Sequence, residues 1–342
     1  MPEQSKKKIS GKVIFNCLTA ALSVGLLAYF CLSDNGLLTL VKSSQNFQGG
    51  WLAAGLGCTF TDLFLDMMLT FLFTKSVSDT YTVGRAFKVC MVGHLYSAIT
   101  PFQSGGQPMQ IYVMSKQKID PGAATSMMVQ KFFVYQMGIT IYSLLAILYQ
   151  TLFAHIPLSS AMWGLAMVGF AVQAGAAVIL LVFSFNQSLT HWMLTHGAKL
   201  LAKLHIVKDP EQTVAKWQVQ IDVFHQSNQQ LYKNKKLLVF VSILTFLQLT
   251  ALFAASYCVY RAFGFCSASL VSMIFSQAFV TMVSSLVPLP GAAGASEGSF
   301  YVFFASYFTP QTLKSAILLW RIITYYAVIL VSAPFSHIRE KM

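Results

Sequence analysis

The sequence predicts an all-α polytopic membrane protein, and three observations lead to that prediction. The chain has 342 residues, of which 56% are hydrophobic and only 10% are charged, and its mean hydropathy is +0.61. A soluble domain could not cover so much apolar surface with so few charges. Several segments contain about 20 nearly uncharged residues, the length that crosses roughly 30 Å of hydrocarbon. Basic residues gather between these segments, as the positive-inside rule expects.

The first apolar run covers residues 13–33 and follows a basic stretch that contains Lys6, Lys7, Lys8 and Lys12. This run is too long for the hydrophobic region of a typical signal peptide, and no convincing small-residue cleavage site accompanies it. We therefore expect a retained first span. Five further full spans are expected at residues 51–74, 122–150, 161–185, 237–262 and 313–335.

Two other apolar regions are interrupted by helix breakers. Residues 86–116 are broken between Pro101 and Pro108, and residues 268–309 are broken at PLPGAAGASEG, residues 288–298. The pieces on each side of the first break are too short to cross a bilayer alone. Each region is therefore either one bent crossing or a hairpin that enters and leaves the membrane on the same side.

Loop charges favour hairpins. If residues 86–116 crossed the membrane, the lysine-rich segment 186–236 would lie outside, against the observed bias of Lys and Arg. With two hairpins, the external loops 34–50 and 151–160 are nearly free of basic residues. The sequence therefore predicts about six full transmembrane helices, two re-entrant broken hairpins, and cytoplasmic N- and C-termini.

The segment 186–236 is basic and amphipathic, and we expect it to lie at the cytoplasmic interface, attracted to anionic headgroups. A solvated loop is the alternative for its second half. The net charge of +12 does not indicate a nucleic-acid partner, because no basic, aromatic-interleaved soluble domain is present. The six cysteines lack metal-site spacing, so neither a metal nor a cofactor is expected.

The two breaks are related in sequence position. Lys131 follows Gln107 by 24 residues, and Arg321 follows Glu297 by the same number. Three full crossings separate the two units, an odd number, so the second unit is expected to be inverted. Inverted repeats with interrupted helices at matching positions indicate a binding site at the membrane midplane. The expected repeats cover residues 51–150 and 237–336 of one membrane domain that spans residues 1–342.

Backbone N–H and C=O groups cannot stay unpaired in hydrocarbon, so each break must be buried in protein or face a watery cavity. Glycines let a ligand approach the backbone closely, and the restarting half-helices present N–H groups suited to an anion such as phosphate. Kinked helices without a function are the structural alternative. The sequence therefore predicts a polar site at membrane depth.

Ionisable residues inside the spans support that site. Lys131 and Arg321 lie well within apolar runs, where a charge marks a functional site unless its side chain snorkels to the interface. Asp62 and Asp66 are four residues apart and share one helical face. They need a cation or a proton, and a purely structural ion pair with one of the two cations is the alternative. His94 is expected to be a hydrogen-bonded packing residue rather than a proton relay.

The stretch GASEG, residues 294–298, formally matches the nucleophile elbow G-x-S-x-G of α/β-hydrolases. That motif needs a preceding strand, a following helix and a positioned histidine. Apolar helices flank this stretch and it has no obvious histidine partner. Serine hydrolysis is therefore not expected.

The segments TPFQSGGQPMQIYVMSKQKI, VPLPGAAGASEG and LWRIITYY resemble the lysylphosphatidylglycerol synthase transmembrane, or flippase-like, family, and the similarity covers nearly the whole chain. That family includes the N-terminal flippase domain of the bacterial multiple peptide resistance factor. The resemblance implies a bacterial inner-membrane protein that moves aminoacylated phosphatidylglycerol, typically the lysyl form, to the outer leaflet. There the added positive charge reduces binding of cationic antimicrobial peptides. The matching positions are Gly105, Gly106, Gln107, Pro108, Pro290, Gly291, Gly294, Glu297 and Arg321.

The chain ends at Met342 without the soluble transferase domain of the resistance factor, so synthase activity is not expected. The hypothesis is a lipid flippase in which cations and half-helix N-termini hold the phosphate while carboxylates neutralise the ammonium. The expected substrate-binding residues are Asp62, Asp66, Gly105, Gly106, Gln107, Pro108, Lys131, Pro290, Gly291, Gly294, Ser296, Glu297 and Arg321.

Two other functions are compatible with the sequence. One is a proton-coupled secondary transporter of a small organic anion. The other is a membrane scaffold for a separately encoded aminoacyl-phosphatidylglycerol synthase. The expected partners are a phospholipid substrate and membrane lipids, and a homo-oligomer is compatible with the sequence.

Overall fold

The computed structural model describes residues 47–76, 78–154, 159–185 and 233–336, together with isolated positions between 188 and 226. Within these ranges every regular element is a helix, and the chain is a polytopic all-α membrane protein as predicted. Five helical runs are long and apolar enough to cross a membrane. They are α3 (Gly49–Lys75), α6 (Pro121–Tyr149), α7 (Ser160–Phe185), α10 (Lys235–Ala262), and α13 (Pro310–Arg321) continuing through the π-helical turn Ile322–Tyr326 into α14 (Ala327–Ser332).

These five runs match five of the six predicted spans. The predicted first span, residues 13–33, lies outside the described residues, as does nearly all of the basic segment 186–236.

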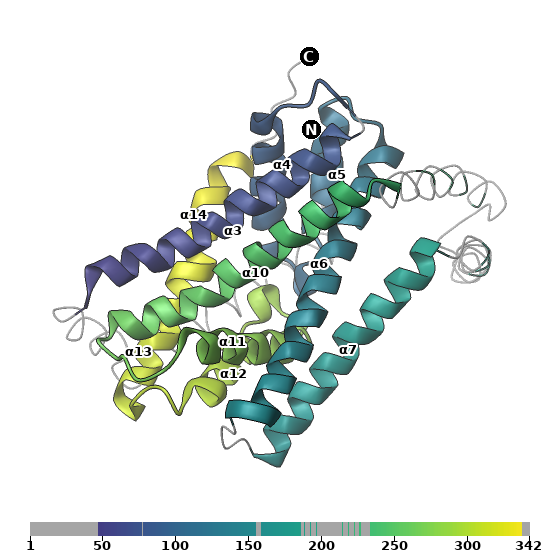
Figure 1. Cartoon of the computed structure of the whole chain (residues 1–342). Coiled ribbons are helices and arrows are strands. Elements are labelled where there is room, and N and C mark those ends of the chain that lie inside the picture. The colour runs from purple at the N-terminus through teal and green to yellow at the C-terminus, as the bar shows by residue number, and fades with distance from the viewer. Residues whose placement is uncertain are drawn as a thin grey trace, which may run out of the picture.

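Helices α3 and α10 form the most extensive helix pair, and they run antiparallel along their whole length (Figure 1). The N–H of Gln48, just before α3, donates to the carbonyl of Ala262 at the end of α10 over 3.1 Å. In the middle of the pair, the Gln248 amide reaches Asp62. Close packing is possible because Gly55 lies directly against Cys258 and Ile323.

Each predicted interrupted region folds as a hairpin of two helices. In the first hairpin, α4 (Val83–Ile99) packs against α5 (Gly106–Lys116) across a 3-10 turn, Pro101–Gln103. In the second, α11 (Leu270–Ser284) packs against α12 (Ala295–Phe304) across the 3-10 turn Pro290–Ala292. The α4–α5 hairpin lies toward the upper end of the view in Figure 1, and the α11–α12 hairpin lies toward the lower end. The two breaks contact each other.

Both breaks end earlier than predicted, and the second also begins earlier, because α11 ends at Ser284. Helix α5 begins at Gly106, so Gln107 and Pro108 belong to its first turn, and Ser296 and Glu297 belong to the first turn of α12. Proline is tolerated there because the first N–H groups of a helix have no partner within the helix.

The two breaks begin with the same backbone conformation and then diverge, because Ser104 and Gly105 are helical whereas Ala293 is extended and Gly294 has a φ of +83°. Thr100 and Leu289 are both extended, and the residues two places later, Phe102 and Gly291, are both left-handed, with φ/ψ of 51°/19° and 59°/17°. The breaks therefore coincide at an offset of 189 residues. This is one fewer than the offset of 190 residues that aligns Lys131 with Arg321 and Gln107 with Glu297. In that register Glu297 falls opposite Pro108 rather than Gln107.

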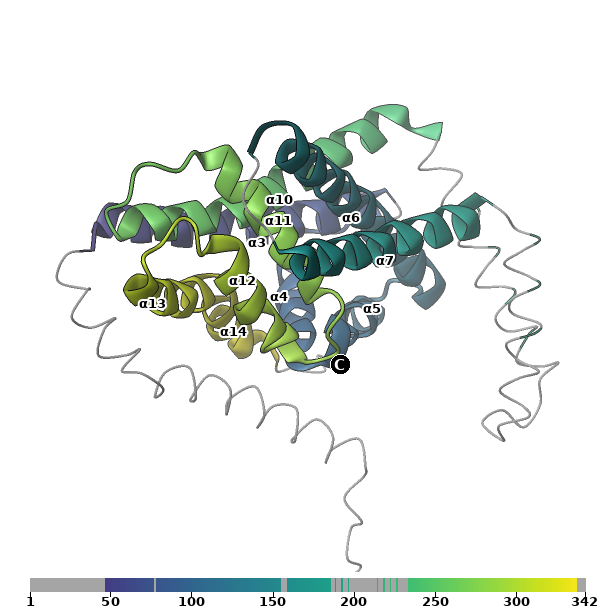
Figure 2. The same cartoon turned by 90° about the horizontal axis from the view of Figure 1, so that it is seen from below.

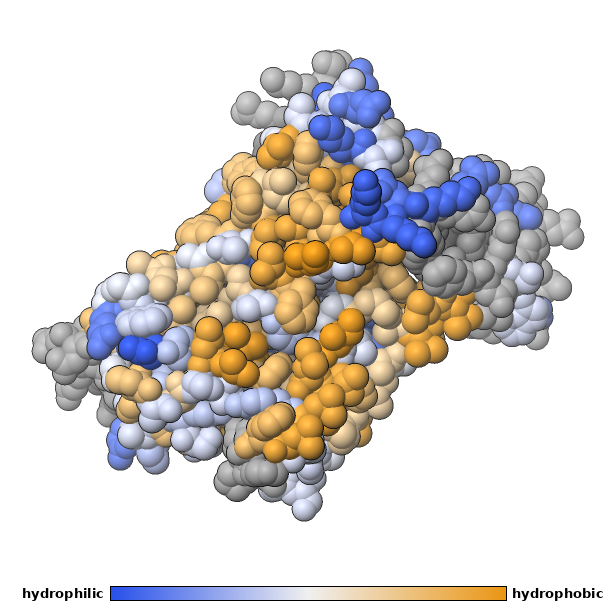
Figure 3. Space-filling view, viewed as in Figure 1, coloured by the Kyte–Doolittle hydropathy of each residue, from blue (hydrophilic) through white to orange (hydrophobic). Residues whose placement is uncertain are grey.

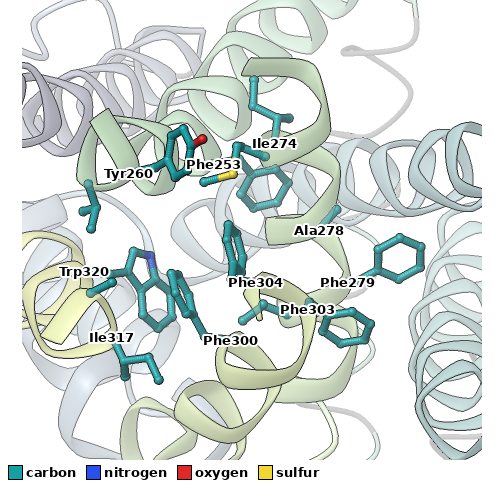
Figure 4. Close-up of a cluster of buried hydrophobic side chains, with 14 of the residues drawn as sticks. Phe253, Tyr260, Ile274, Ala278, Phe279, Phe300, Phe303, Phe304, Ile317 and Trp320 are labelled. Carbon is teal, nitrogen blue, oxygen red and sulfur yellow. The ribbon is translucent and has the colours of Figure 1, made fainter. Parts of the chain in front are cut away.

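The cores around the two hairpins differ in composition. Aromatic side chains dominate around the second hairpin, where Phe279 stacks on Phe303 at 5.3 Å and Phe300 stacks on Phe304 at 4.0 Å between ring centroids (Figure 4). Helix α11 lies at the centre of this region and contacts α6, α7, α10 and α12 (Figure 2). The core around the first hairpin is instead rich in methionine: Met67, Met91, Met114, Met127 and Met128 are all buried there.

The surface has the pattern of a membrane protein. In Figure 3 hydrophobic residues cover the middle of the visible face, and hydrophilic residues gather at the upper end, where α3 ends and α10 begins. Helix α7 exposes Val168, Val172, Val178 and Ile179, each at least half exposed. In a bilayer these side chains contact lipid.

Candidate functional site

The first charged cluster joins α3 to α6. The Lys131 ammonium lies 2.6 Å from Asp66 Oδ1 and donates a hydrogen bond of 2.7 Å to Thr70 Oγ1. Both charged side chains are nearly nine-tenths buried. Asp66 and Thr70 are four residues apart and therefore lie on one face of α3. This arrangement satisfies a lysine charge inside the helix bundle.

Asp62 and His94 complete this cluster. The Gln248 side chain on α10 donates to Asp62 Oδ1 over 2.9 Å. His94 on α4 places Nε2 3.2 Å from Asp66 Oδ2, an ion-pair contact when the imidazole is protonated. The cluster, hereafter the Asp62–Lys131 cluster, consists of Asp62, Asp66, Thr70, His94, Lys131 and Gln248.

The second charged group holds the second break in place. Arg321 donates from Nε to Glu297 Oε1 over 2.7 Å and from Nη2 to the carbonyl of Gly291 over 2.9 Å. Glu297 Oε2 accepts a hydrogen bond of 2.7 Å from the N–H of Gly294, at the N-terminus of α12. The carboxylate thus lies where the helix dipole favours a negative charge. Arg321 and Glu297 are buried and fix the backbone of the break.

The N-termini of the two half-helices after the breaks are therefore not alike. Helix α12 carries a carboxylate in its first turn, whereas α5 has no acidic residue there and no side-chain cap. The N–H of Gly105 donates to Thr100 Oγ1 over 2.9 Å, which orders the turn before α5. Of these two N-termini, only that of α5 lacks an internal carboxylate.

Neighbouring atoms leave no room for a Cβ at Gly106 and Gly291, two of the predicted positions. A Cβ on Gly106 would overlap Ser97 Oγ and lie 2.9 Å from the carbonyl oxygen of Gly93, inside α4. A Cβ on Gly291 would lie 2.5 Å from the ring of Tyr325. The hydroxyl of Tyr325 donates to the carbonyl of Ala98 over 2.8 Å, so the last span of the chain is tied to the end of α4. The tyrosine thereby holds the two breaks together.

The structure separates the predicted site residues into groups. Lys131 and Arg321 do not lie in one cluster: each has its own carboxylate, Asp66 and Glu297 respectively. The structural ion pair weighed for the α3 acids is present between Asp66 and Lys131. Snorkelling does not occur for either cation, because the side chains of Lys131 and Arg321 are only 12% and 7% exposed and are paired inside the protein.

Ser296 does not have the surroundings of a hydrolase nucleophile. It follows a 3-10 turn rather than a strand, and its hydroxyl donates to Ser284 Oγ over 3.0 Å and to the Gly291 carbonyl over 3.3 Å. These contacts support the backbone of the second break.

Three residues that the sequence did not single out contribute to these groups: Thr70, Gln248 and Tyr325. Thr70 continues the four-residue spacing of Asp62 and Asp66, and this spacing was a usable signal. Gln248 and Tyr325 act across long sequence distances, and no local pattern reveals such contacts.

Comparison with known protein families identifies the family of this chain. No curated protein matches the chain. Residues 16–332 match a protein family described as the lysylphosphatidylglycerol synthase transmembrane region. The matched range includes both hairpins and both charged groups. Since it covers nearly the whole chain, the protein belongs to the lysylphosphatidylglycerol synthase transmembrane region family.

Proposed function

We propose that this protein is a lipid flippase that moves aminoacylated phosphatidylglycerol from the inner to the outer leaflet of the bacterial cytoplasmic membrane. The observation that carries the proposal is the meeting of two helix breaks from opposite ends of the molecule, beside buried charged groups. Irregular backbone at membrane depth occurs only where it is buried in protein or lines a polar passage. A headgroup passage between the hairpins is the function this arrangement supports best.

The proposed passage lies between two inverted repeats. A long helix, a helical hairpin with a 3-10 break and a second long helix occur in the same order in both halves. The first helices of the halves, α3 and α10, pack antiparallel, as a two-fold axis in the membrane plane would place them. Transporters built this way bind their substrate between the repeats and expose it alternately to the two sides.

Each part of the headgroup has a chemical counterpart near the breaks. The N-terminus of α5 offers the N–H groups of Gly106 and Gln107 to the lipid phosphate. Lys131 and Arg321 add positive charge, which acts strongly where water is excluded. The carboxylates of the Asp62–Lys131 cluster attract the ammonium groups of a lysyl headgroup. The acyl chains remain in the bilayer throughout.

A leaflet-exposure assay tests this proposal. Purified protein is reconstituted into vesicles with fluorescent lysyl-phosphatidylglycerol, and a membrane-impermeant quencher measures how fast the lipid changes leaflets. The expected result is rapid flipping by the wild type and at least a tenfold lower rate for Lys131→Met and Arg321→Met. Lys75→Met, which removes an exposed charge at the end of α3, serves as the matched control.

Because Lys131→Met leaves Asp66 without its cation, the paired variant Lys131→Met/Asp66→Asn is assayed beside it. Slow flipping by both shows that the loss is not caused only by an unpaired Asp66 carboxylate. Wild-type rates for Lys131→Met and Arg321→Met would exclude the assigned roles, and an inactive wild type would exclude the function.

A further inference from the structure

The Asp62–Lys131 cluster holds one carboxylate that has no cation. Asp66 lies beside both Lys131 and His94, whereas Asp62 accepts a hydrogen bond only from the neutral amide of Gln248. Within the described ranges of the chain, no basic side chain lies at ion-pair distance from Asp62. Asp62 is nevertheless only 7% exposed. With neutral His94, the two carboxylates and one ammonium leave one negative charge.

A buried carboxylate at mid-span is costly unless it binds a proton or a cation. The groups around Asp62 come from four helices: Asp66 on α3, His94 on α4, Lys131 and Tyr135 on α6, and Gln248 on α10. Gln248 occupies one carboxylate oxygen, and the other has no hydrogen-bond donor within the described part of the chain. The Asp62 carboxylate is thus oriented by an amide, with no positively charged group of the described residues at ion-pair distance.

The second charged group shows the contrast. Both oxygens of Glu297 are occupied, one by Arg321 and the other by the N–H of Gly294. Its charge is balanced inside the protein, so it needs no external cation. Of the three predicted acids, Asp62 alone lacks a positively charged partner in the described residues.

We propose that Asp62 is an exchange site that binds in turn a proton and an ammonium group of the lipid, which makes the protein a proton–lipid antiporter. This inference rests on the proposed flippase function. When the ammonium enters from the inner leaflet, the O–H bond of protonated Asp62 breaks and the proton leaves to cytoplasmic water. When the ammonium leaves at the outer side, the carboxylate takes a proton from external water. One positive charge crosses in each direction at this site.

The exchange also answers an electrostatic difficulty. Lysyl-phosphatidylglycerol carries one phosphate and two ammonium groups, so its net charge is positive. Moving it outward is opposed by a membrane potential that is negative inside. A proton that moves inward on the same site offsets that electrical work. A lipid without an ammonium group does not exchange with a proton at Asp62, so its transport is not coupled to the proton in this way.

Binding measurements at different pH values test the exchange. The purified full-length chain is titrated with lysyl-phosphatidylglycerol and, separately, with phosphatidylglycerol in nanodiscs or by native mass spectrometry. Competition with a proton predicts that affinity for the lysyl lipid falls about tenfold per pH unit below the titration of Asp62. Affinity for phosphatidylglycerol, which has no ammonium, should lack this loss.

Three variants assign the effect to a residue. Asp62→Asn should abolish the pH dependence, because an amide cannot exchange a proton for ammonium. His94→Gln should keep it, since the close contact of His94 is with Asp66 and the Asp62 carboxylate remains to exchange the proton. Asp79→Asn, in an exposed loop, removes a carboxylate outside the cluster and should also keep it.

The outcomes separate the inference from the function on which it rests. Equal pH dependence for the two lipids would overturn the exchange, and this comparison needs no variant to fold. Loss of the pH dependence in His94→Gln would assign the proton to the histidine and would also overturn it. Flipping of the lysyl lipid with pH-independent binding would contradict only the exchange. Absence of both binding and flipping would contradict the proposed function as well.

Discussion

At the scale of single residues, the charged side chains of this protein are held by a few specific partners. Lys131 has one carboxylate and one hydroxyl within hydrogen-bond distance, and Arg321 has a carboxylate and a backbone carbonyl. Each cation therefore stabilises its surroundings, in addition to the role in ligand binding that we propose for it. Removing one partner of an ion pair leaves the other charge unpaired in the protein interior, which solvates charge poorly.

Lys131→Met is expected to destabilise the protein by about 3–5 kcal/mol, because it leaves Asp66 buried without its ammonium. Lys131→Met/Asp66→Asn should recover much of that loss, since no unpaired charge remains. Thermal unfolding of the purified variants measures both effects. Additive losses in the double variant would mean that the two residues are not coupled.

Gly291→Ala is expected to destabilise the second break. The residue has a φ of +59°, which costs an alanine about 1–2 kcal/mol, and the added methyl group would collide with Tyr325. Gly298→Ala is the matched control, because nothing lies within 4 Å of its position and it sits exposed in α12. There alanine should be neutral or stabilising by up to about 1 kcal/mol. Equal melting temperatures for the two variants would contradict this account.

At the scale of secondary structure, the two breaks begin alike in backbone form but differ in composition. Both have two successive residues with positive φ, Phe102 and Gln103 in the first and Gly291 and Ala292 in the second, and the second break adds Gly294. The second break is fixed by Glu297 and Arg321 and packs among aromatic rings. The first break has no such pair among the described residues, and the α4–α5 hairpin around it packs among methionines, which adapt more readily to changes of shape. We therefore expect the first hairpin to be the more mobile of the two.

Glu297→Ala should loosen the start of α12. Loss of the carboxylate removes the acceptor of the Gly294 N–H, and losing a helix cap costs about 1–2 kcal/mol. Amide hydrogen exchange in the peptide that contains Gly294 should become roughly tenfold faster. The peptide at the start of α5 has no corresponding carboxylate and should exchange as in the wild type. Faster exchange at α5 alone would show that Glu297 does not cap α12.

Much of this arrangement was predictable from the sequence because hydrophobic length and helix breakers are local properties. The described spans agree with the predicted ranges within a few residues, and both breaks lie where glycine and proline cluster. The starts of α5 and α12 came earlier than expected, since a first turn tolerates Pro108 and accommodates Glu297. The partner of Asp62 was not predictable. Gln248 is 186 residues away, and a neutral amide in an apolar span carries no signal of its own.

At the scale of the whole molecule, the two halves meet along α3 and α10 and at the two breaks. Tyr325 and Gln248 tie the halves by hydrogen bonds at these contacts. A headgroup passing between the breaks requires the halves to shift relative to each other. Since α3 and α10 share the longest contact, we expect part of that shift to occur along this pair.

Cys58 on α3 and Cys258 on α10 allow this motion to be tested. Their sulfur atoms are 3.9 Å apart, so a mild oxidant such as copper phenanthroline should join them after a small side-chain rotation. The bond would fix the two long helices at one point, and we expect flipping to fall at least tenfold and to recover when a reductant opens the bond. Mass spectrometry of unreduced peptides measures the crosslinked fraction. Cys258→Ser under the same oxidant serves as the control and should retain its rate. Unchanged flipping in fully crosslinked protein would locate the motion elsewhere, with α3 and α10 as a fixed axis around which only the hairpins move.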